Sequence, residues 1–195
     1  MDKQVFLDLG CYMNRRIFFP TAEEALASEH AREWDISSCE DLFSALVEGR
    51  ETAYRFCRNR EFQDNVACGA QKIDAGGVLC DRVSLAGFSV WGEFRETFFF
   101  RFRNREEKRE IFFRDLTDVN YIPFSGDGDA EREWFAQAAP RLRDLTIQNS
   151  FGPRTVHLYE QTFVFPEADA LEEIVLPDNP LMRIFAITVA QGGKI

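Results

Sequence analysis

The sequence contains few of the residues on which metal centres and the common catalytic motifs depend. Its two histidines, His30 and His157, lie far apart in the chain, which argues against the histidine-rich metal site of a cupin-type jelly roll. The five cysteines form no CxxC pair, so reduced, mostly buried thiols are expected rather than a zinc site or a disulfide framework. No GxSxG nucleophile motif occurs. We therefore predict a non-enzymatic protein without metal or cofactor, although a triad assembled in space would leave no such motif.

Long apolar runs are also missing, and one sign of charge dominates. No apolar stretch approaches the roughly 20 residues that span a bilayer, and the opening MDKQVFLDLG has no signal-peptide pattern. The 33 acidic residues against 23 basic ones give a net charge of -10. Such a field repels phosphate backbones and anionic membrane surfaces. We expect a cytoplasmic protein that binds neither nucleic acid nor membrane.

The length and composition are those of one globular domain. The chain has 195 residues, of which 45% are hydrophobic and 29% charged, and it shows no internal repeat, low-complexity tract or linker. Phenylalanine occurs 20 times, against 3 tryptophans and 4 tyrosines. Because phenylalanine carries no polar group, most of this aromatic content is expected to fill a core. The prediction is a single domain over residues 1–195.

Alternation of apolar and polar residues predicts antiparallel strands joined by turns. In RETFFFRFR (residues 95–103) the phenylalanines at even positions face one way and the polar residues largely face the other. A turn at 104–107 and a returning strand at 109–114 complete a hairpin. Further strands are expected at 4–10, 54–57, 66–73, 82–90, 144–149, 155–165, 171–176 and 182–190. A shift of the apolar positions around Gly87 predicts a bulge or bend there.

Helices are few and short in this pattern. They are expected at about 22–31, around Leu42, Phe43 and Leu46, and at about 129–139. They do not alternate with the strands, so a β-sandwich or barrel is favoured over a βαβ fold. The fold class predicted is all-β, an antiparallel sandwich with a few inserted helices.

Three segments carry a family resemblance. They are VFLDLGCYMNRRIF (5–18), DNVACGAQKIDAGGVLCDRVSLAGF (64–88) and LEEIVLPDNPLMRIFAITV (171–189). With their Tyr12-Met13-Asn14 element, Leu85-Ala86-Gly87 strand end and Leu-Pro-Asp-Asn-Pro turn, they resemble galactose-binding-like β-sandwich modules found beside bacterial glycoside hydrolases. The resemblance implies a jelly-roll sandwich that binds carbohydrate in loops at one end.

Strand direction predicts where such a site would lie. The loop that enters the first strand of the hairpin and the loop that leaves the second must meet at the end opposite the turn. These loops contain Trp91, Glu93 and Arg95 on one side and Asp115, Asp118, Asn120 and Tyr121 on the other, and we expect Trp91 and Tyr121 to be close neighbours. An aromatic face with carboxylate, amide and guanidinium groups suits a sugar ring and its hydroxyls.

Blander interpretations of the same residues stay open. Trp91 could cap the core, and Asp115 and Asp118 could be turn residues that bond their own backbone. Asp127-Gly128-Asp129 begins like a calcium loop but has no glutamate at the twelfth position, which favours a solvated loop or helix cap.

Three functions follow from these predictions. The first is non-catalytic carbohydrate binding at the loops named above. The alternative is a structural or interaction module that forms a homo-oligomer or binds a partner through an exposed apolar face. A glycoside hydrolase comes last, because it needs two carboxylates about 5–10 Å apart in a cleft and no spacing in the sequence singles out such a pair.

Overall fold

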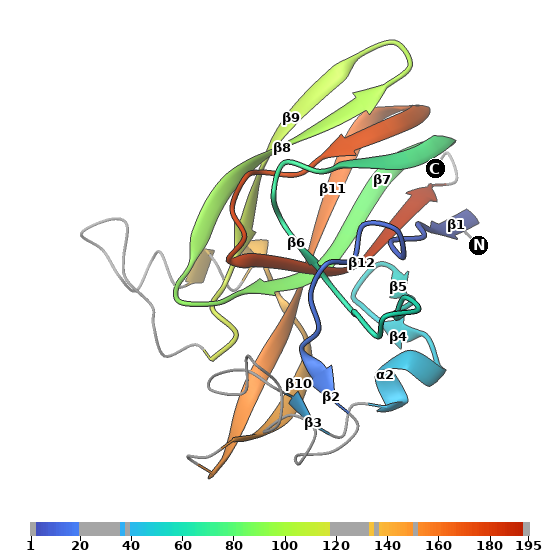
Figure 1. The fold of residues 1–195 in the computed structure, drawn as a ribbon. Coiled ribbons are helices and arrows are strands. Elements are labelled where there is room, and N and C mark those ends of the chain that lie inside the picture. Colours follow the sequence, from blue (N-terminus) through green and yellow to red (C-terminus); the bar gives the residue numbers. More distant parts are fainter. Residues whose placement is uncertain are drawn as a thin grey trace.

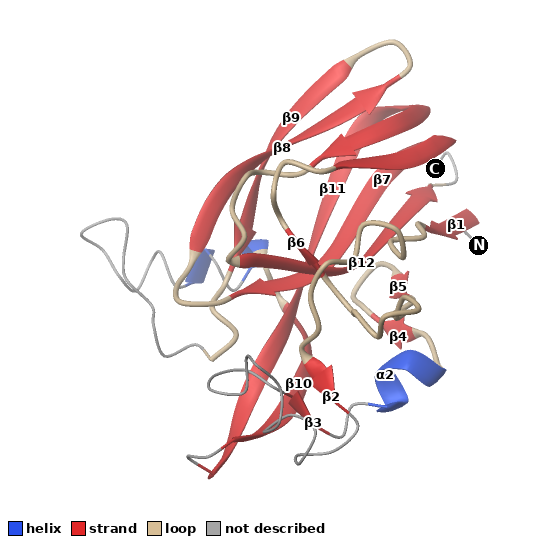
Figure 2. Cartoon of the chain, viewed as in Figure 1, coloured by secondary structure: helices blue, strands red, loops and turns tan. Residues whose placement is uncertain are grey.

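The computed structural model of the chain describes residues 3–19, 36–37, 40–117, 133–134, 137–149 and 152–192. Strands make up nearly all of the regular structure in these residues (Figure 2). Every strand pair in the large sheet is antiparallel. The all-β prediction is confirmed, whereas the jelly-roll connectivity stays a prediction.

One large sheet organises the molecule (Figure 1). Along its main path the order is β1-β12-β7-β11-β8-β9, with β6 paired to β12 and β10 paired to β11. Its eight strands are β1 (Lys3–Phe6), β6 (Val66–Ala67), β7 (Lys72–Ser89), β8 (Phe94–Phe102), β9 (Glu106–Phe113), β10 (Arg141–Asn149), β11 (Gly152–Val175) and β12 (Met182–Gln191).

Small elements cover parts of this sheet. Strands β2 (Phe18–Phe19) and β3 (Ile36–Ser37) form a short parallel pair, and β4 (Val47–Glu48) and β5 (Ala53–Tyr54) form a short hairpin. Helix α2 (Glu40–Ser44) confirms the second predicted helix. The first predicted helix and the Asp127-Gly128-Asp129 segment lie outside the described residues. Of the third predicted helix, residues 133–134 and 137–138 are described and are helical.

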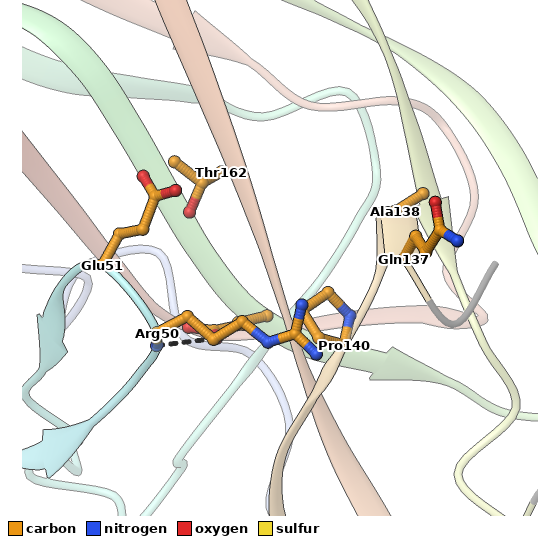
Figure 3. A pocket seen from close by; sticks show the side chains of 7 residues that line it. Arg50, Glu51, Gln137, Ala138, Pro140 and Thr162 are labelled. Atoms are coloured by element: carbon orange, nitrogen blue, oxygen red, sulfur yellow. Dashed lines mark hydrogen bonds between the residues drawn. The ribbon is translucent and has the colours of Figure 1, made fainter. Parts of the chain in front are cut away.

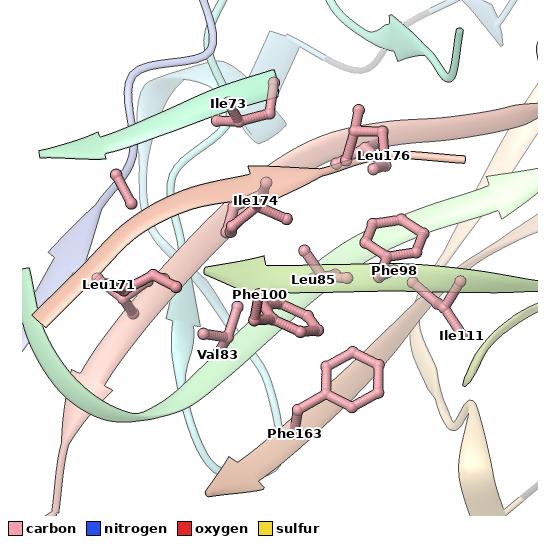
Figure 4. Close-up of a cluster of buried hydrophobic side chains, with 14 of the residues drawn as sticks. Ile73, Val83, Leu85, Phe98, Phe100, Ile111, Phe163, Leu171, Ile174 and Leu176 are labelled. Atoms are coloured by element: carbon pink, nitrogen blue, oxygen red, sulfur yellow. The ribbon is translucent and has the colours of Figure 1, made fainter. Parts of the chain in front are cut away.

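Both faces of the central strands are buried, each in its own hydrophobic core. In β7, Val83 and Leu85 belong to the first core, while Ala86 and Phe88 belong to the second. Successive side chains of a strand point to opposite faces, so the two cores lie on opposite sides of the sheet. The first core (Figure 4) includes the predicted buried phenylalanines of the hairpin, Phe98, Phe100 and Phe102.

Two-sided burial explains the shift of apolar positions at Gly87, where a bulge or bend was predicted. The shift in apolar positions marks the change from one core to the other, and β7 pairs with β11 through Gly87 without a register shift. The irregularity predicted here lies in the pairing with β12: Gly87 pairs with Ile184 and Ala86 with Ala186, so the extra residue of the bulge is in β12. A Cβ at Gly87 would lie 2.3 Å from the Arg183 carbonyl oxygen and 2.6 Å from Phe113 Cζ. The glycine therefore permits close contact between neighbouring segments.

Two strand lengths also differ from the prediction. The strands expected at 155–165 and 171–176 are parts of the single strand β11, and β7 continues through Gly76 and Gly77, where a break was expected. The register between β7 and β11 shifts twice. Between Val164 and Asp169 the extra residues lie in β11, and between Leu171 and Glu173 they lie in β7, at Gly76 and Gly77. The first part of β11 pairs with β10 and its last residues pair with β8.

Within the described ranges, none of the helices has the length and apolar character needed to cross a membrane.

The N-terminal segment is fixed to the sheet by a buried carboxylate. Asp64, 1% exposed, accepts backbone N–H bonds from Ile17 at 3.1 Å and Phe18 at 2.8 Å, and a bond from the Asn65 amide at 2.8 Å. Burial raises the pKa of Asp64 from its ordinary 3.8 to about 6, because desolvation of the charge outweighs these hydrogen bonds.

Replacing Gly87 with alanine is expected to lower the free energy of unfolding by about 3 kcal/mol, because a backbone carbonyl and a buried ring must both move. The control is Gly69→Ala, where the nearest atom to an added Cβ is 3.6 Å away in the Gln71 side chain. Urea denaturation of both variants checks this. Equal effects at the two positions would contradict the close approach at Gly87.

The raised pKa of Asp64 predicts a pH-dependent stability. Its contribution is fully present below about pH 3.8, where the group is protonated in both states, and is lost as the pH rises through about 6. Relative to Asp64→Asn, wild type should therefore lose about 3 kcal/mol of unfolding free energy across this range. Urea denaturation at several pH values measures the difference, with the exposed Asp74→Asn as control. A flat difference would refute the shift.

Candidate functional site

The predicted hairpin is present, and the chain segments at its open end meet. Strands β8 and β9 pair from Phe94 opposite Phe113 to Arg101 opposite Glu106. At the other end, Ser89 forms a parallel bridge with Asp115. The Ser89 amide donates to the Arg114 carbonyl at 2.9 Å, and the Leu116 amide donates to the Ser89 carbonyl at 3.0 Å. We call residues 90–93 and 114–117 the hairpin base.

Asp115 holds the hairpin base together from inside. Its side chain is fully buried, and its Oδ2 accepts the Gly92 amide at 2.8 Å. Its Oδ1 accepts the Thr117 amide at 2.9 Å and the Thr117 hydroxyl at 2.5 Å. The Ser89 hydroxyl donates to the Gly92 carbonyl at 2.5 Å. The carboxylate therefore acts on its own backbone, as the turn interpretation of Asp115 predicted, and also fixes the opposite loop.

Glu93 also points inward. It is 8% exposed, and its Oε1 lies 3.5 Å from the Nε of Arg114. The Arg114 guanidinium carbon stands 5.2 Å from the ring centroid of Tyr159, whose hydroxyl donates to the Asp115 carbonyl at 3.3 Å. A buried carboxylate is stabilised when it faces a cation. The Glu93–Arg114 pair therefore links the two segments of the hairpin base.

Trp91 lies at the surface in an unusual backbone conformation. Its φ is 67°, in the left-handed region that large side chains rarely adopt, and 55% of the residue is exposed. Gly92 follows with a φ of 134°. Trp91 is not among the buried or partly buried residues of either hydrophobic core. Two hydrogen bonds hold this strained turn in place: the Ser89 hydroxyl donates to the Gly92 carbonyl, and the Gly92 amide donates to the Asp115 carboxylate.

Arg95 is exposed and lies beside a second surface aromatic residue, which the sequence analysis did not place in the site. Its guanidinium carbon is 5.2 Å from the ring of Trp134 and 6.0 Å from that of Phe112. The Phe112 and Trp134 rings meet edge to face at 5.7 Å, and Trp134 is 47% exposed. Only a contact across distant parts of the chain brings Trp134 here, and no local pattern signals it.

The remaining predicted site residues, Asp118, Asn120 and Tyr121, lie outside the described residues, and the proximity of Trp91 to Tyr121 stays a prediction. Within the part of the chain that the structure describes, no group of three or more His, Cys, Asp or Glu side chains could hold a metal ion. The Nδ1 of His157 lies 2.7 Å from Asp144 Oδ1.

A small pocket lies elsewhere on the sheet, and no sequence pattern pointed to it. Its volume is about 170 Å³, and it is bounded by β11, by the turn between β4 and β5, and by the segment before β10 (Figure 3). The lining residues are Arg50, Glu51, Gln137, Ala138, Pro140, Glu160 and Thr162.

Replacing Asp115 with alanine should lower the free energy of unfolding by about 2–3 kcal/mol, because the buried Gly92 amide and two half-buried Thr117 donors lose their acceptor. It should also change the fluorescence of Trp91 as its turn relaxes. Asp74→Ala is the matched control, since that exposed carboxylate accepts only the Gly76 amide among the bonds described. A loss no larger than that of the control would argue against the supporting role of Asp115.

The chain matches no protein-family model, and comparison with curated proteins gives no match. The resemblance to galactose-binding-like modules therefore depends on the three sequence segments alone. Those segments supply mainly core and turn residues, among them Asp64, Leu85 and Gly87. They bear on the fold more than on the chemistry of a site.

Proposed function

We propose that this protein is a non-catalytic carbohydrate-binding protein of the galactose-binding-like, jelly-roll type, with its ligand site at the hairpin base. The observation that carries the proposal is Trp91, a half-exposed indole on a left-handed backbone turn. Such a conformation costs about 1–3 kcal/mol and persists only where the surroundings enforce it. Here a buried carboxylate and a serine hydroxyl enforce it while the ring itself stays at the surface.

The exposed groups suit a sugar ring. An indole face packs against the apolar C–H side of a pyranose, as aromatic rings do in polar-rimmed sites. The Arg95 guanidinium, steadied over the Trp134 ring, offers several donors in fixed directions for neighbouring hydroxyls. In this proposal Trp91 and Arg95 contact the ligand, and Trp134 adds a second aromatic surface.

The two described carboxylates then have a positioning role. Asp115 is fully buried and bonded to the turn, and Glu93 faces Arg114, so neither oxygen pair is presented to solvent as a sugar acceptor. They fix the loop before the ligand arrives, which reduces the ordering cost of binding. Acceptors for the sugar hydroxyls would come from Asp118, Asn120 and Tyr121, the predicted residues that follow the described part of this loop.

The proposal predicts that Trp91→Ala weakens glycan binding at least about tenfold, because the stacking surface is lost. Binding is measured first on a glycan array and then by calorimetry with the best ligand. Phe62→Ala is the matched control: Phe62 is also aromatic, 60% exposed and left-handed at φ 60°, but it lies in a turn closed by Asn59. Failure of wild type to bind any glycan, or equal losses in the two variants, would reject the site.

A further inference from the structure

Arg183 on β12 is a half-buried cation without a described partner for its charge. Its Nε and Nη1 atoms are buried and have no hydrogen-bond partner. Among the residues that the structure describes, none forms an ion pair or hydrogen bond with this side chain. Its third nitrogen, Nη2, is not among the buried atoms and is open to solvent. A guanidinium in such surroundings is costly unless an anion faces it.

The Arg183 guanidinium keeps its charge in spite of this cost. Burial, and then the neighbouring charge of Arg15, lower the pKa of Arg183 to about 10, which is still well above neutral pH. A lysine in the same place could release its proton, whereas arginine retains it. At neutral pH this position on β12 therefore holds a permanent positive charge.

Strand register places Arg15 on the same face as Arg183. Arg183 lies opposite Ala67 of β6. Asn65, two residues before Ala67, lies opposite Arg15 in an isolated antiparallel bridge. Residues directly opposite each other, and residues two apart in an extended segment, point to the same side. The two arginine side chains therefore leave the same face on either side of residues 65–67, and Arg15 is exposed there.

Hydrogen bonds fix the backbone between the two arginines. Arg15 and Asn65 exchange backbone N–H bonds, each at 3.3 Å. The Asn14 side chain accepts the Ala67 amide at 2.9 Å and donates to the Ala67 carbonyl at 3.2 Å. The Arg15 side chain itself has one described bond, from Nη1 to the Asn14 carbonyl at 3.3 Å. Both guanidinium groups thus project from a fixed backbone, which reduces the ordering cost of binding a ligand between them.

The carboxylates of this region are bonded elsewhere. Asp64 accepts the amides of the N-terminal segment described above. Glu96, which acts electrostatically on the neighbouring Cys68, accepts the Asn179 amide at 2.9 Å. Neither carboxylate forms an ion pair with Arg183, so the two arginines present an uncompensated positive charge on this face.

We propose that Arg183 and Arg15 form a binding site for a small phosphate dianion, either inorganic phosphate or a phosphate monoester. Guanidinium groups present their donors in a planar fork that matches phosphate oxygens, and two positive charges suit a doubly charged anion. The net charge of -10 disfavours long polyanions, which limits the ligand to a small compound. The site involves no residue of the hairpin base and does not depend on carbohydrate binding.

Sodium phosphate at about pH 8, where the dianion predominates, is the probe. Sodium acetate is the singly charged control, and sodium chloride keeps the ionic strength constant. The readout is the NMR signal of the Arg183 Nε–H, which phosphate should shift saturably, whereas acetate should bind at least about tenfold more weakly. Glycerol 3-phosphate, titrated in parallel, distinguishes the two sources, because tighter binding than that of inorganic phosphate points to a monoester. No saturable shift with either phosphate compound, or an equal response to acetate, would overturn the site.

Charge-removing variants test the two arginines separately. Arg183→Gln should weaken phosphate binding at least about tenfold, and Arg15→Gln about threefold or more. Arg103→Gln, which alters an exposed arginine beside Glu172, is the matched control and should leave the affinity unchanged. Because Arg15 is exposed, its variant gives an answer even if Arg183→Gln fails to fold. Unchanged affinity in either variant of the site would contradict the assignment.

Thermal unfolding tests whether the chain itself satisfies Arg183. Arg183→Met keeps an apolar stem and removes the charge. Without phosphate, the melting temperature of this variant should equal or exceed that of wild type, because an unpaired charge is removed. Phosphate should raise the melting temperature of wild type but not that of the variant. A variant that melts well below wild type without phosphate would mean that the guanidinium has a partner within the chain, which would overturn the proposal.

Discussion

The structure depends on burying both faces of β7 while both of its edges are paired. Val83 and Leu85 pack into one core, and Ala86 and Phe88 pack into the other. Strand β12 runs along one edge and β11 along the other. Because both faces and both edges of β7 are occupied, the segments packed closely around Gly87 have little room to move apart. The segments bonded to the end of β7 are therefore held in fixed positions.

The hairpin base, which forms the candidate site, is bonded to the end of β7 in this way. Strand β7 ends at Ser89, and the chain that leaves the β8 and β9 hairpin pairs with this residue through Arg114 and Leu116. Leu116 in turn accepts the His157 amide at 2.7 Å, which ties the same segment to β11. These hydrogen bonds to β7 and β11 fix the position of the buried Asp115. Asp115 in turn holds the strained Trp91 turn through its bond with Gly92.

Sequence reasoning succeeded where a single strand or hairpin carried its own signal. The alternation in residues 95–103 predicted the buried Phe98 and Phe100, and strand direction predicted that the two loops at the hairpin base would meet. Sequence reasoning could not reveal the two-sided burial of β7. Apolar residues change from odd to even positions around Gly87, and this pattern is the same whether the strand has a bulge or has both faces buried. The inward turn of Glu93 depends on Arg114, a partner that no local pattern specifies.

Trp134 and the Glu160 pocket show the same limit over longer distances. Each is assembled from segments far apart in the chain. The Arg50 backbone amide and the Tyr54 hydroxyl, which donate to Glu160, precede it by more than 100 residues.

The claim central to this account is that the backbone strain at Trp91 serves to present its ring. The most direct measurement is the free energy of unfolding of Trp91→Gly, since glycine adopts a positive φ without steric cost. The account predicts a change within about 1 kcal/mol together with lost glycan binding. A loss of about 2–5 kcal/mol, as for a truncated core side chain, would contradict it.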